Sequence, residues 1–293
     1  MKQLIIRRMT ASDLAWNIFY KFRFWFYRNF FSRKLRRISA LEKEGWINTF
    51  NDDFDEISWS DDLTKKWHVN LNYAQFHPNY PFTYDGPPEL VRGTSCARFS
   101  VMYDPKTFDD DKITGNPITI SFRKSMIKTN YSFKQQYGRF ESRCQIPYDR
   151  GVWPAFWLFG HPYPPEIDVF ELSGGRDGST AGVQQINLHY GEPSERPWQM
   201  MKAWKVKISD PEPIGLLHEF ALEWSPGKIE IFTDNVKIFR YTRKEILDKW
   251  FNLDTSELWL VQNHSIDSAI IKQEDKLYYS EYLVDYVRAY KKI

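Results

Sequence analysis

The chain has 293 residues, a formal net charge of +2 and 17% aromatic residues, with 12 tryptophans. A charge so close to balance carries no overall signal for a polyanionic partner such as nucleic acid, and 2 cysteines exclude a disulfide framework. The length suits one large domain of the β-sandwich type with an extension. Free buried thiols are expected for Cys96 and Cys144, although one bridge between them is compatible with the sequence.

Residues 1–45 form a basic, aromatic extension. They hold eleven basic and three acidic side chains, a net charge of +8, which leaves −6 for residues 46–293 out of the total of +2. Residues 14–27 are rich in aromatic and basic side chains, and their apolar members fall near one helical face, which predicts a helix. Either Thr10 or Ser12 would be its N-cap.

The composition of this extension leaves its role open. Lysine and arginine interrupt its apolar residues and no small-residue cleavage site follows Phe31, so it is not typical of a secretory signal. It is also too charged and too short to span a bilayer. A basic aromatic helix could pack on its own domain or on a sister subunit, dock on a partner protein, or lie on an anionic membrane surface.

Residues 46–293 are predicted to be rich in β-strands. Apolar and polar residues alternate at 118–123, 185–190 and 228–233, and the last of these precedes the turn Asp234-Asn235, which is typical of a β-hairpin. Residues 242–250 are the one clear helical candidate in this part of the sequence. The pattern predicts an all-β fold of two packed antiparallel sheets.

The apolar run Gly151–Gly160 is strand-like and places the indoles of Trp153 and Trp157 on one face. A loop at 161–165 leads into the next predicted strand, so the two strands are expected to be antiparallel neighbours. Core packing is the commoner fate of tryptophan. The alternative is that the two indoles stack on the apolar face of a sugar.

The strand that follows, Glu166–Glu171, reads E-I-D-V-F-E. Glu166 and Asp168 point to one face because side chains alternate along a strand, whereas strict alternation would turn Glu171 to the other face. A one-residue bulge across Val169-Phe170 would return Glu171 to the face of Glu166. The spacing therefore predicts three carboxylates on one face of a bulged strand.

Three such carboxylates have more than one interpretation. They could form a solvated face, which is the usual role of acidic residues on a strand, or bind a hard cation. Crowded carboxylates also push their pKa values apart, which suits acid–base chemistry. Indoles beside them favour a sugar as the reacting molecule.

Five segments, in order, resemble the signature of glycoside hydrolase family 16, which contains laminarinases, lichenases, agarases and carrageenases. An opening stretch at 46–54 is similar to the family's W…F-x-D-x-F, so the resemblance covers about residues 46–293. A glycine-rich segment of many relatives is absent at 260–267. The five segments are Tyr137–Arg143, Trp153–Trp157, Glu166–Glu171, His218–Trp224 and Val284–Tyr290.

The resemblance implies a concanavalin A-like β-jelly-roll sandwich of two antiparallel sheets, preceded by the helical extension. It also implies an endo-acting hydrolase that retains anomeric configuration, with Glu166 as nucleophile and Glu171 as general acid/base. Asp168 would hydrogen-bond Glu166 and bias its protonation. Retention requires the two catalytic carboxyl groups at about 5–5.5 Å. Trp153 and Trp157 would stack on sugars before the cleaved bond.

Two further residues follow from the resemblance. His189 matches a position where a histidine often lies near the acid/base, although a purely structural role is equally expected of a lone histidine. Asp285 matches a position that can ligate a structural calcium ion on the convex face. No other cofactor is expected.

The polysaccharide itself is not identified by the sequence. The bulged motif favours the laminarinase, agarase and carrageenase side of the family, so a β-1,3-glucan, a galactan or a capsular-type glycan is expected. Alternatives are a transglycosylase acting on cell-wall glycan and a non-catalytic carbohydrate-binding or structural protein. A polysaccharide substrate implies action outside the cell, reached by non-classical release or as part of a phage. Basic residues that could bind sulfate or uronate groups, or face solvent, are Arg196, Lys202, Lys205 and Lys207.

Overall fold

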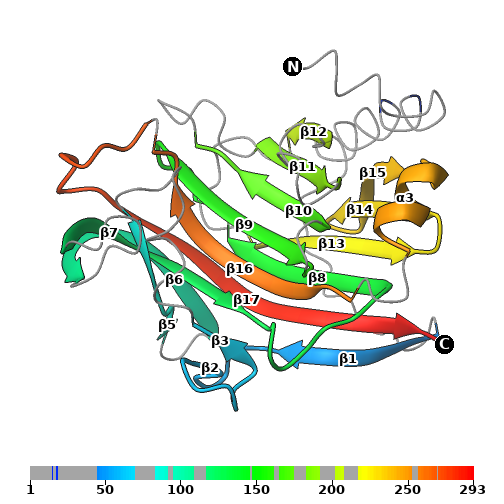
Figure 1. The fold of residues 1–293 in the computed structure, drawn as a ribbon, viewed down its shortest axis with the longest axis horizontal. Helices are drawn as coiled ribbons and strands as arrows, with labels where there is room; N and C mark the ends of the chain where they lie inside the picture. The colour runs from blue at the N-terminus through cyan, green and yellow to red at the C-terminus, as the bar shows by residue number, and fades with distance from the viewer. Residues whose placement is uncertain are drawn as a thin grey trace.

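A computed structural model describes most of residues 45–293 (Figure 1). Before Gly45 it describes only Ala15 and Ile18, so the predicted helical extension and its N-cap lie outside the described residues. Among the described residues no helix is long and apolar enough to cross a bilayer. The described ranges are 45–69, 83–91, 95–108, 117–145, 147–161, 165–174, 183–191, 202–207, 217–252, 257–268 and 270–293.

The strands form two layers. In the first layer each strand pairs antiparallel with the next, in the order β12, β11, β10, β9, β16 and β7. In Figure 1 β12 lies near the upper edge of the molecule and β9 and β16 cross its centre. The bounds are β12 (Lys202–Lys207), β11 (Val183–His189), β10 (Glu166–Leu172), β9 (Val152–Phe159), β16 (Trp259–Ile266) and β7 (Ile118–Lys128).

The second layer follows the order β15, β14, β13, β8 and β17, again with antiparallel neighbours. Strands β1 and β6 both pair with the free edge of β17. Because β6 also pairs with β7, the two layers join into one continuous sheet at that end. The bounds are β15 (Val236–Tyr241), β14 (Lys228–Thr233), β13 (Leu217–Ser225), β8 (Gly138–Gln145), β17 (Tyr279–Lys292), β1 (Trp46–Asp52) and β6 (Cys96–Phe108).

Short elements complete the described fold. Strands β3 and β4 lie along the edge of β7, β2 is parallel to β3, and β5 pairs with β6. The helix α3 matches the predicted helical candidate. The bounds are β2 (Trp59–Ser60), β3 (Trp67–His68), β4 (Thr83–Gly86), β5 (Glu89–Val91) and α3 (Lys244–Trp250).

A large apolar core fills the space between the layers. Alternate residues of each strand face it, and Phe170 of β10 meets Phe220 of β13 across the layers with ring centroids 4.3 Å apart. Each large side chain buried in this way contributes about 1.5–3 kcal/mol. Cys96 and Cys144 are free and buried, as predicted. The all-β prediction is confirmed, but the two predicted sheets are packed layers of one continuous sheet.

The predicted hairpin is also confirmed. Thr233 of β14 pairs with Val236 of β15 across a two-residue turn. Asp234 and Asn235 have φ angles of 49° and 62°, the left-handed conformation that this class of hairpin turn requires. Asparagine and aspartate tolerate that conformation better than other residues with a side chain, which explains why the turn was readable in the sequence.

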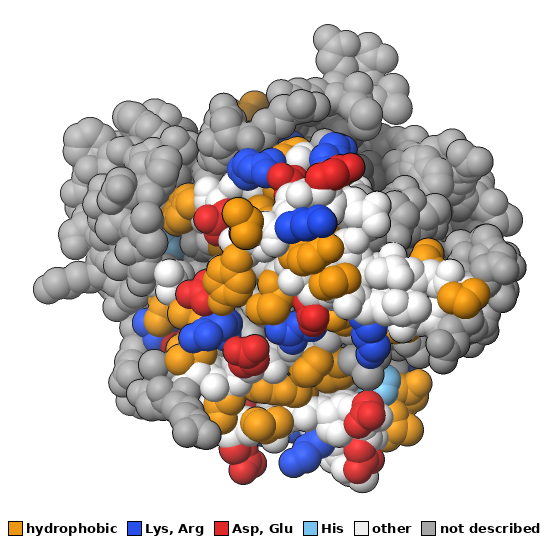
Figure 2. Space-filling view, turned by 90° about the vertical axis from the view of Figure 1, so that its left-hand side faces the viewer, with side chains coloured by type: hydrophobic (Ala, Val, Ile, Leu, Met, Phe, Trp, Pro, Cys, Tyr) orange, Lys and Arg blue, Asp and Glu red, His pale blue; other side chains and the backbone are white. Residues whose placement is uncertain are grey.

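Charged side chains of both signs are mixed on the face of the molecule seen in Figure 2. Hydrophobic, basic and acidic side chains are interleaved there. This mixture agrees with the small net charge of the chain.

Candidate active site

The three carboxylates lie on the face of the first layer that points away from the core, here named the carboxylate face. Residues paired across neighbouring strands point to the same side of a sheet, so the pairing defines three rows that cross the strands. Each row begins on β11 and passes through one carboxylate of β10. The rows are His189–Glu166–Phe159–Trp259, Asn187–Asp168–Trp157–Val261 and Gln185–Glu171–Ala155–Asn263.

The predicted bulge is present in β10. Asp168 pairs with Asn187 and Glu171 pairs with Gln185, so three steps along β10 match two steps along β11. Val169 and Phe170 both belong to the apolar core, whereas strict alternation would turn one of them to the carboxylate face. The extra residue returns Glu171 to the face of Glu166, as the spacing of the motif predicts.

His189 lies opposite Glu166 and binds the carboxylates at that end of the strand. Its Nε2 is 3.1 Å from Asp168 Oδ2 and 3.5 Å from Glu166 Oε1. The resemblance placed this histidine near the acid/base, whereas the strand register sets it opposite Glu166. Its direct contacts are therefore with Glu166 and Asp168.

Glu171 is held by hydrogen bonds from three side chains. The indole Nε1 of Trp153 donates to Oε1 at 2.8 Å. The amides of Asn187 and Gln185 donate to Oε2, the latter at 3.4 Å. Both carboxyl oxygens are thus fixed in direction, and Trp153 has a second role besides the predicted stacking.

The protonation of the cluster departs strongly from that of exposed groups. Burial, together with the charge of Asp168, raises the pKa of Glu171 to about 7. Burial also raises the pKa of Glu166 well above its usual range; the positive charge of His189 opposes this rise, and Asp168 adds to it. Interacting groups of this kind titrate as a unit.

His189 carries the positive charge of the site. Burial alone would lower its pKa, but the charges of Glu166 and Asp168 outweigh burial and raise the pKa to about 10. One ligand atom each from Glu166, Asp168 and His189 lie within 4.8 Å of one another, a spacing that could hold a metal ion. In the structure these side chains form an ion-paired cluster, in which His189 Nε2 lies between the carboxylates of Asp168 and Glu166.

Aromatic side chains line the carboxylate face next to the three carboxylates. Trp157 is partly exposed and its Nε1 donates to Asn263 Oδ1 at 2.7 Å. Phe159 packs edge-on against Trp157 and lies 5.1 Å from Trp259, measured between ring centroids. The three rings form an aromatic strip beside Glu166 and Asp168, a surface suited to stacking on a pyranose.

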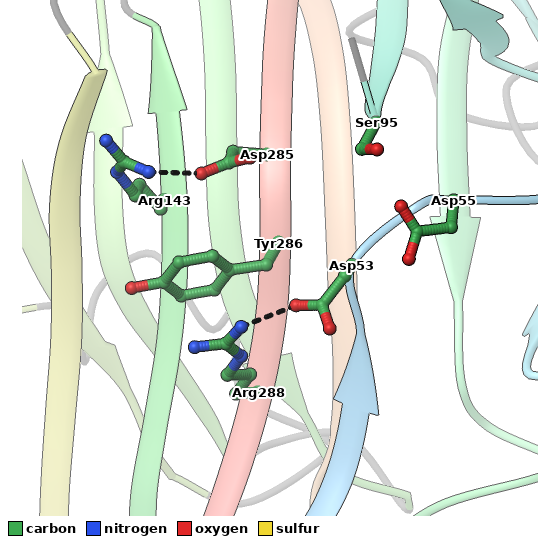
Figure 3. Close-up of a pocket in the computed structure, with 7 residues that line it drawn as sticks. All are labelled: Asp53, Asp55, Ser95, Arg143, Asp285, Tyr286 and Arg288. Carbon is green, nitrogen blue, oxygen red and sulfur yellow. Dashed lines mark hydrogen bonds and ion pairs between the residues drawn. The ribbon is translucent and has the colours of Figure 1, made fainter. Parts of the chain in front are cut away.

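Asp285, the predicted calcium ligand, lies on the outer face of the second layer, in a hollow of about 370 Å³. Figure 3 shows it turned toward Arg143, whose Nη1 is 2.5 Å from Asp285 Oδ2. Beside it Arg288 Nη2 pairs with Asp53 Oδ1 at 2.6 Å. A cation at Asp285 or Asp53 would compete with a guanidinium group for the carboxylate. Binding of calcium at Asp285 stays a prediction.

The structure brings together five of the predicted site residues, while Trp157 lies in the adjoining strip. The five are the carboxylate triad of Glu166, Asp168 and Glu171, together with Trp153 and His189. Asn187 and Gln185 were missed, although alternation backward from His189 on the same predicted strand would have found both. Phe159 continues the alternation of Trp153 and Trp157. Lys205 of β12 is exposed and pairs with Gln185 of β11. Arg196 and the side chains of Lys202 and Lys207 lie outside the described part.

The model of the family described as glycosyl hydrolases family 16 matches residues 97–264, which contain the triad, the bulge and the aromatic strip. The match covers more than half of the chain. The chain belongs to glycosyl hydrolase family 16. This confirms the resemblance seen in the ordered motifs.

Relatives of known activity agree with this membership. The chain is 28% identical over 271 residues to the endo-1,3-1,4-beta-glycanase EglC of Rhizobium meliloti, with 86% of this chain and 53% of EglC covered. It is 30% identical over 230 residues to ExsH of the same organism, with 77% and 43% covered. The family 16 chain thus spans about half the length of these curated relatives.

Solved structures of the family show the same fold. The laminarinase catalytic domain of Thermotoga maritima superposes with a TM-score of 0.66 at 19% identity, covering 85% of this chain and 99% of that chain. The endo-beta-1,3-glucanase of Pyrococcus furiosus gives a TM-score of 0.67 at 19% identity, covering 85% and 95%. At this identity the likeness supports the jelly-roll fold alone.

Proposed function

We propose that the chain is a retaining endo-glycoside hydrolase that cleaves a β-linked glucan. The observation that carries the proposal is Glu171, a partly buried carboxyl with a pKa raised to about 7, set by the bulge on the same face as Glu166. Such a group can hold a proton near neutrality and release it to a leaving group. The beta-glycanase and beta-glucanase relatives support a glucan as substrate.

In the first step Glu171 gives its proton to the glycosidic oxygen while the carboxylate of Glu166 attacks the anomeric carbon. The glycosidic C–O bond breaks, an ester bond to Glu166 forms, and the leaving sugar departs with the proton. Glu166 must be ionised to attack. The positive charge of His189 lowers the pKa of Glu166 and so favours its ionised form.

In the second step Glu171, now ionised, removes a proton from a water molecule. The water oxygen attacks the anomeric carbon from the side of Glu171, the ester breaks, and Glu166 is released as a carboxylate. Two inversions at one carbon give net retention. The separation of the two carboxyl groups expected for this route, about 5–5.5 Å, remains a prediction.

The test uses the isosteric variants Glu166→Gln and Glu171→Gln on laminarin and lichenan, with release of reducing ends as the readout. Each should lower kcat by about 10³-fold or more, since each removes an essential group, while the melting temperature stays near that of the wild type. Glu56→Gln, at an exposed loop carboxylate, is the matched control. Normal turnover by Glu171→Gln would overturn the assignment.

Two other functions on the same fold make different predictions for these experiments. A transglycosylase would share the covalent step, and added acceptor oligosaccharide would then divert product from hydrolysis to longer chains. A binding protein would hold glucan without cleaving it; the Beta-1,3-glucan-binding protein of Penaeus monodon, 28% identical over 135 residues, makes this the second candidate. Cleavage by the wild type decides between binding and catalysis.

A further inference from the structure

The outer face of the second layer, which points away from the core, carries a group of buried charged side chains. Phe140 of β8 and Phe220 of β13 belong to the core, so their neighbours along each strand point to the outer face. Charged side chains are almost never buried unless they are paired. The group, here named the Arg139 cluster, consists of Arg139 and Glu141 of β8 and Glu219 and Glu223 of β13, of which the first three are buried.

Arg139 is the centre of this cluster and binds three carboxylates. Its Nε donates to Glu141 Oε1 at 2.5 Å, and its Nη2 donates to Glu219 Oε1 at 3.3 Å. Its Nη1 donates to Glu223 Oε1 at 2.9 Å. One edge of a guanidinium often binds both oxygens of a single carboxylate, whereas here Glu141 and Glu219 divide the Nε–Nη2 edge. Two buried carboxyl groups therefore lie side by side, and one guanidinium serves three carboxylates.

The hydrogen bonds of the two buried carboxyl groups indicate where a donor is missing. Glu219 Oε2 accepts a hydrogen bond of 2.7 Å from the hydroxyl of Tyr286, so each oxygen of Glu219 has a donor. Glu141 Oε2 is buried and has no hydrogen-bond partner among the described residues. A buried oxygen without a partner is costly. A proton held between Glu141 and Glu219 would supply the donor that this oxygen lacks.

The positive charges next to the Arg139 cluster are already paired with other carboxylates. Arg143 pairs with Asp285. Arg288 pairs with Asp53. Asp234 brings one more negative charge close to the cluster. The charged and titratable groups around the two buried carboxyl groups are Arg139 and Arg143 of β8, Glu223 and His218 of β13, Tyr286 and Arg288 of β17, and Asp234 of the hairpin turn.

These surroundings favour a protonated carboxyl group in the cluster. Burial raises the pKa of Glu219, and the charges of Glu141 and Asp234 add to the rise, which brings the pKa to about 7. The hydrogen bond from Tyr286 and the charge of Arg139 act against this rise. Two carboxyl groups held together in a protein interior resist ionising together, so one of them keeps a proton.

We propose that Glu141 and Glu219 share one proton at neutral pH, and that loss of this proton destabilises the outer face of the second layer. The pair is then a pH-sensitive element of the fold. It lies on the opposite side of the core from Phe220, whose ring meets the first layer, and so it is separate from the carboxylate face. It goes beyond the proposed hydrolase and does not depend on it.

The direction of the effect follows from the two pKa values of Glu219. A glutamate of the unfolded chain has a pKa of about 4.3, whereas the folded value is about 7, so the folded state binds the proton more tightly. The stabilisation is fully present below about pH 4.3 and is lost as the pH rises through about 7. Carboxyl groups of the active site titrate in the same range. Variants that share the same active site are therefore compared with the wild type.

The experiment measures the melting temperature of the whole chain from about pH 4 to about pH 9. Glu219→Gln imitates the protonated carboxyl group, because its amide can donate to Glu141. The wild type should lose about 3–6 °C relative to this variant as the pH rises through that range, and Glu141→Gln should reduce the same step. Glu223→Gln is the matched control, because it also removes a carboxylate from Arg139 but leaves the pair intact. Its difference from the wild type should stay constant with pH within about 1 °C.

Each outcome supports or overturns the shared proton. A difference between the wild type and Glu219→Gln that does not change with pH overturns it and leaves a set of ion pairs. If neither variant of the pair folds, infrared spectra of a chain with Glu166→Gln and Glu171→Gln decide. A carboxylic-acid band present at about pH 6 and lost by about pH 9 is then expected, and the absence of such a band overturns the pair. Cleavage of glucan is not a readout here, so failure of the proposed function would leave these results unchanged.

Discussion

The side-chain amide of Gln184 donates a hydrogen bond of 2.8 Å to the carbonyl oxygen of Val169, inside the bulge of β10. Gln184 is fully buried, and its Oε1 accepts a hydrogen bond of 2.6 Å from Thr233 Oγ1 on β14. A bulge leaves a backbone group without its ladder partner, and here a glutamine supplies one. Because the bulge sets the direction of Glu171, this core contact reaches the reacting carboxyl.

Gln184→Leu should therefore harm catalysis as well as stability. The change leaves the Val169 carbonyl buried without a partner, which costs about 1–3 kcal/mol of unfolding free energy. The bulge then loses its support, and a displacement of Glu171 by a fraction of an ångström should lower kcat about tenfold to a hundredfold. Chemical denaturation and initial rates on the same preparation measure both effects.

Thr233→Val is the matched control for this prediction. It leaves Gln184 Oε1 without its partner but keeps the donor that reaches Val169, so a similar loss of stability is expected with near-normal kcat. Equal rates for the two variants would show that Gln184 supports only the core.

The pH dependence of kcat/KM should be bell-shaped. The active form needs a protonated Glu171, whose pKa is about 7, so activity should fall as pH rises through about 7. It also needs an ionised Glu166, whose pKa is raised above the usual range, so the acid limb should lie above the ordinary glutamate pKa of about 4.3. Initial rates measured from about pH 4 to about pH 9 give both limbs of the profile. A flat profile across neutral pH would contradict the role of Glu171.

Trp153→Phe tests the hydrogen bond that the indole gives to Glu171. The donor favours the ionised carboxylate, so its loss should raise the pKa of Glu171 and move the basic limb to higher pH. Trp157→Phe removes an indole donor to Asn263 instead and should leave that limb in place. A loss of affinity without any movement of the limb would mean that Trp153 acts by stacking alone.

His189→Gln tests whether the cation has a functional role. The positive charge lowers the pKa of Glu166, so its removal should move the acid limb to higher pH and lower kcat. The same pH series provides the measurement. If the acid limb does not move, the histidine is a structural residue, which was one of the two expectations for it.

The pair formed by Arg143 and Asp285 predicts the response to metal removal. With the guanidinium on Asp285 Oδ2, a chelator should leave the melting temperature of the wild type unchanged. Arg143→Ala frees Asp285 beside Asp53 and Asp55 in the same hollow, so added calcium should stabilise this variant. A wild-type melting temperature that falls with chelator would instead support the calcium prediction.

The spacing within Glu166–Glu171 was enough to predict the bulge, because only an extra residue brings all three carboxylates to one face. The hairpin at Asp234-Asn235 was readable for a similar local reason, since its turn residues match the conformation they adopt. Asn187 and Gln185 were within reach by alternation from His189. In each case the information lies within one strand or turn.

Contacts between strands that are far apart in the sequence could not be predicted in this way. Asn263 meets Trp157 only because β16 inserts between β9 and β7, and the two residues are 106 positions apart in the sequence. Thr233 reaches Gln184 from the other layer. The register of such non-local pairs is set by packing of the whole core, and no local pattern reports it.

Within each row across the carboxylate face, every residue comes from a different strand. A substitution at Phe159 or Trp259 therefore alters the protein surface at one position of a row and leaves the bulge of β10 untouched. Substitutions on one strand can then change the preference for one polysaccharide over another without changing the residues that carry out the reaction. This independence is a physical reason why one jelly-roll fold can support enzymes that act on different polysaccharides.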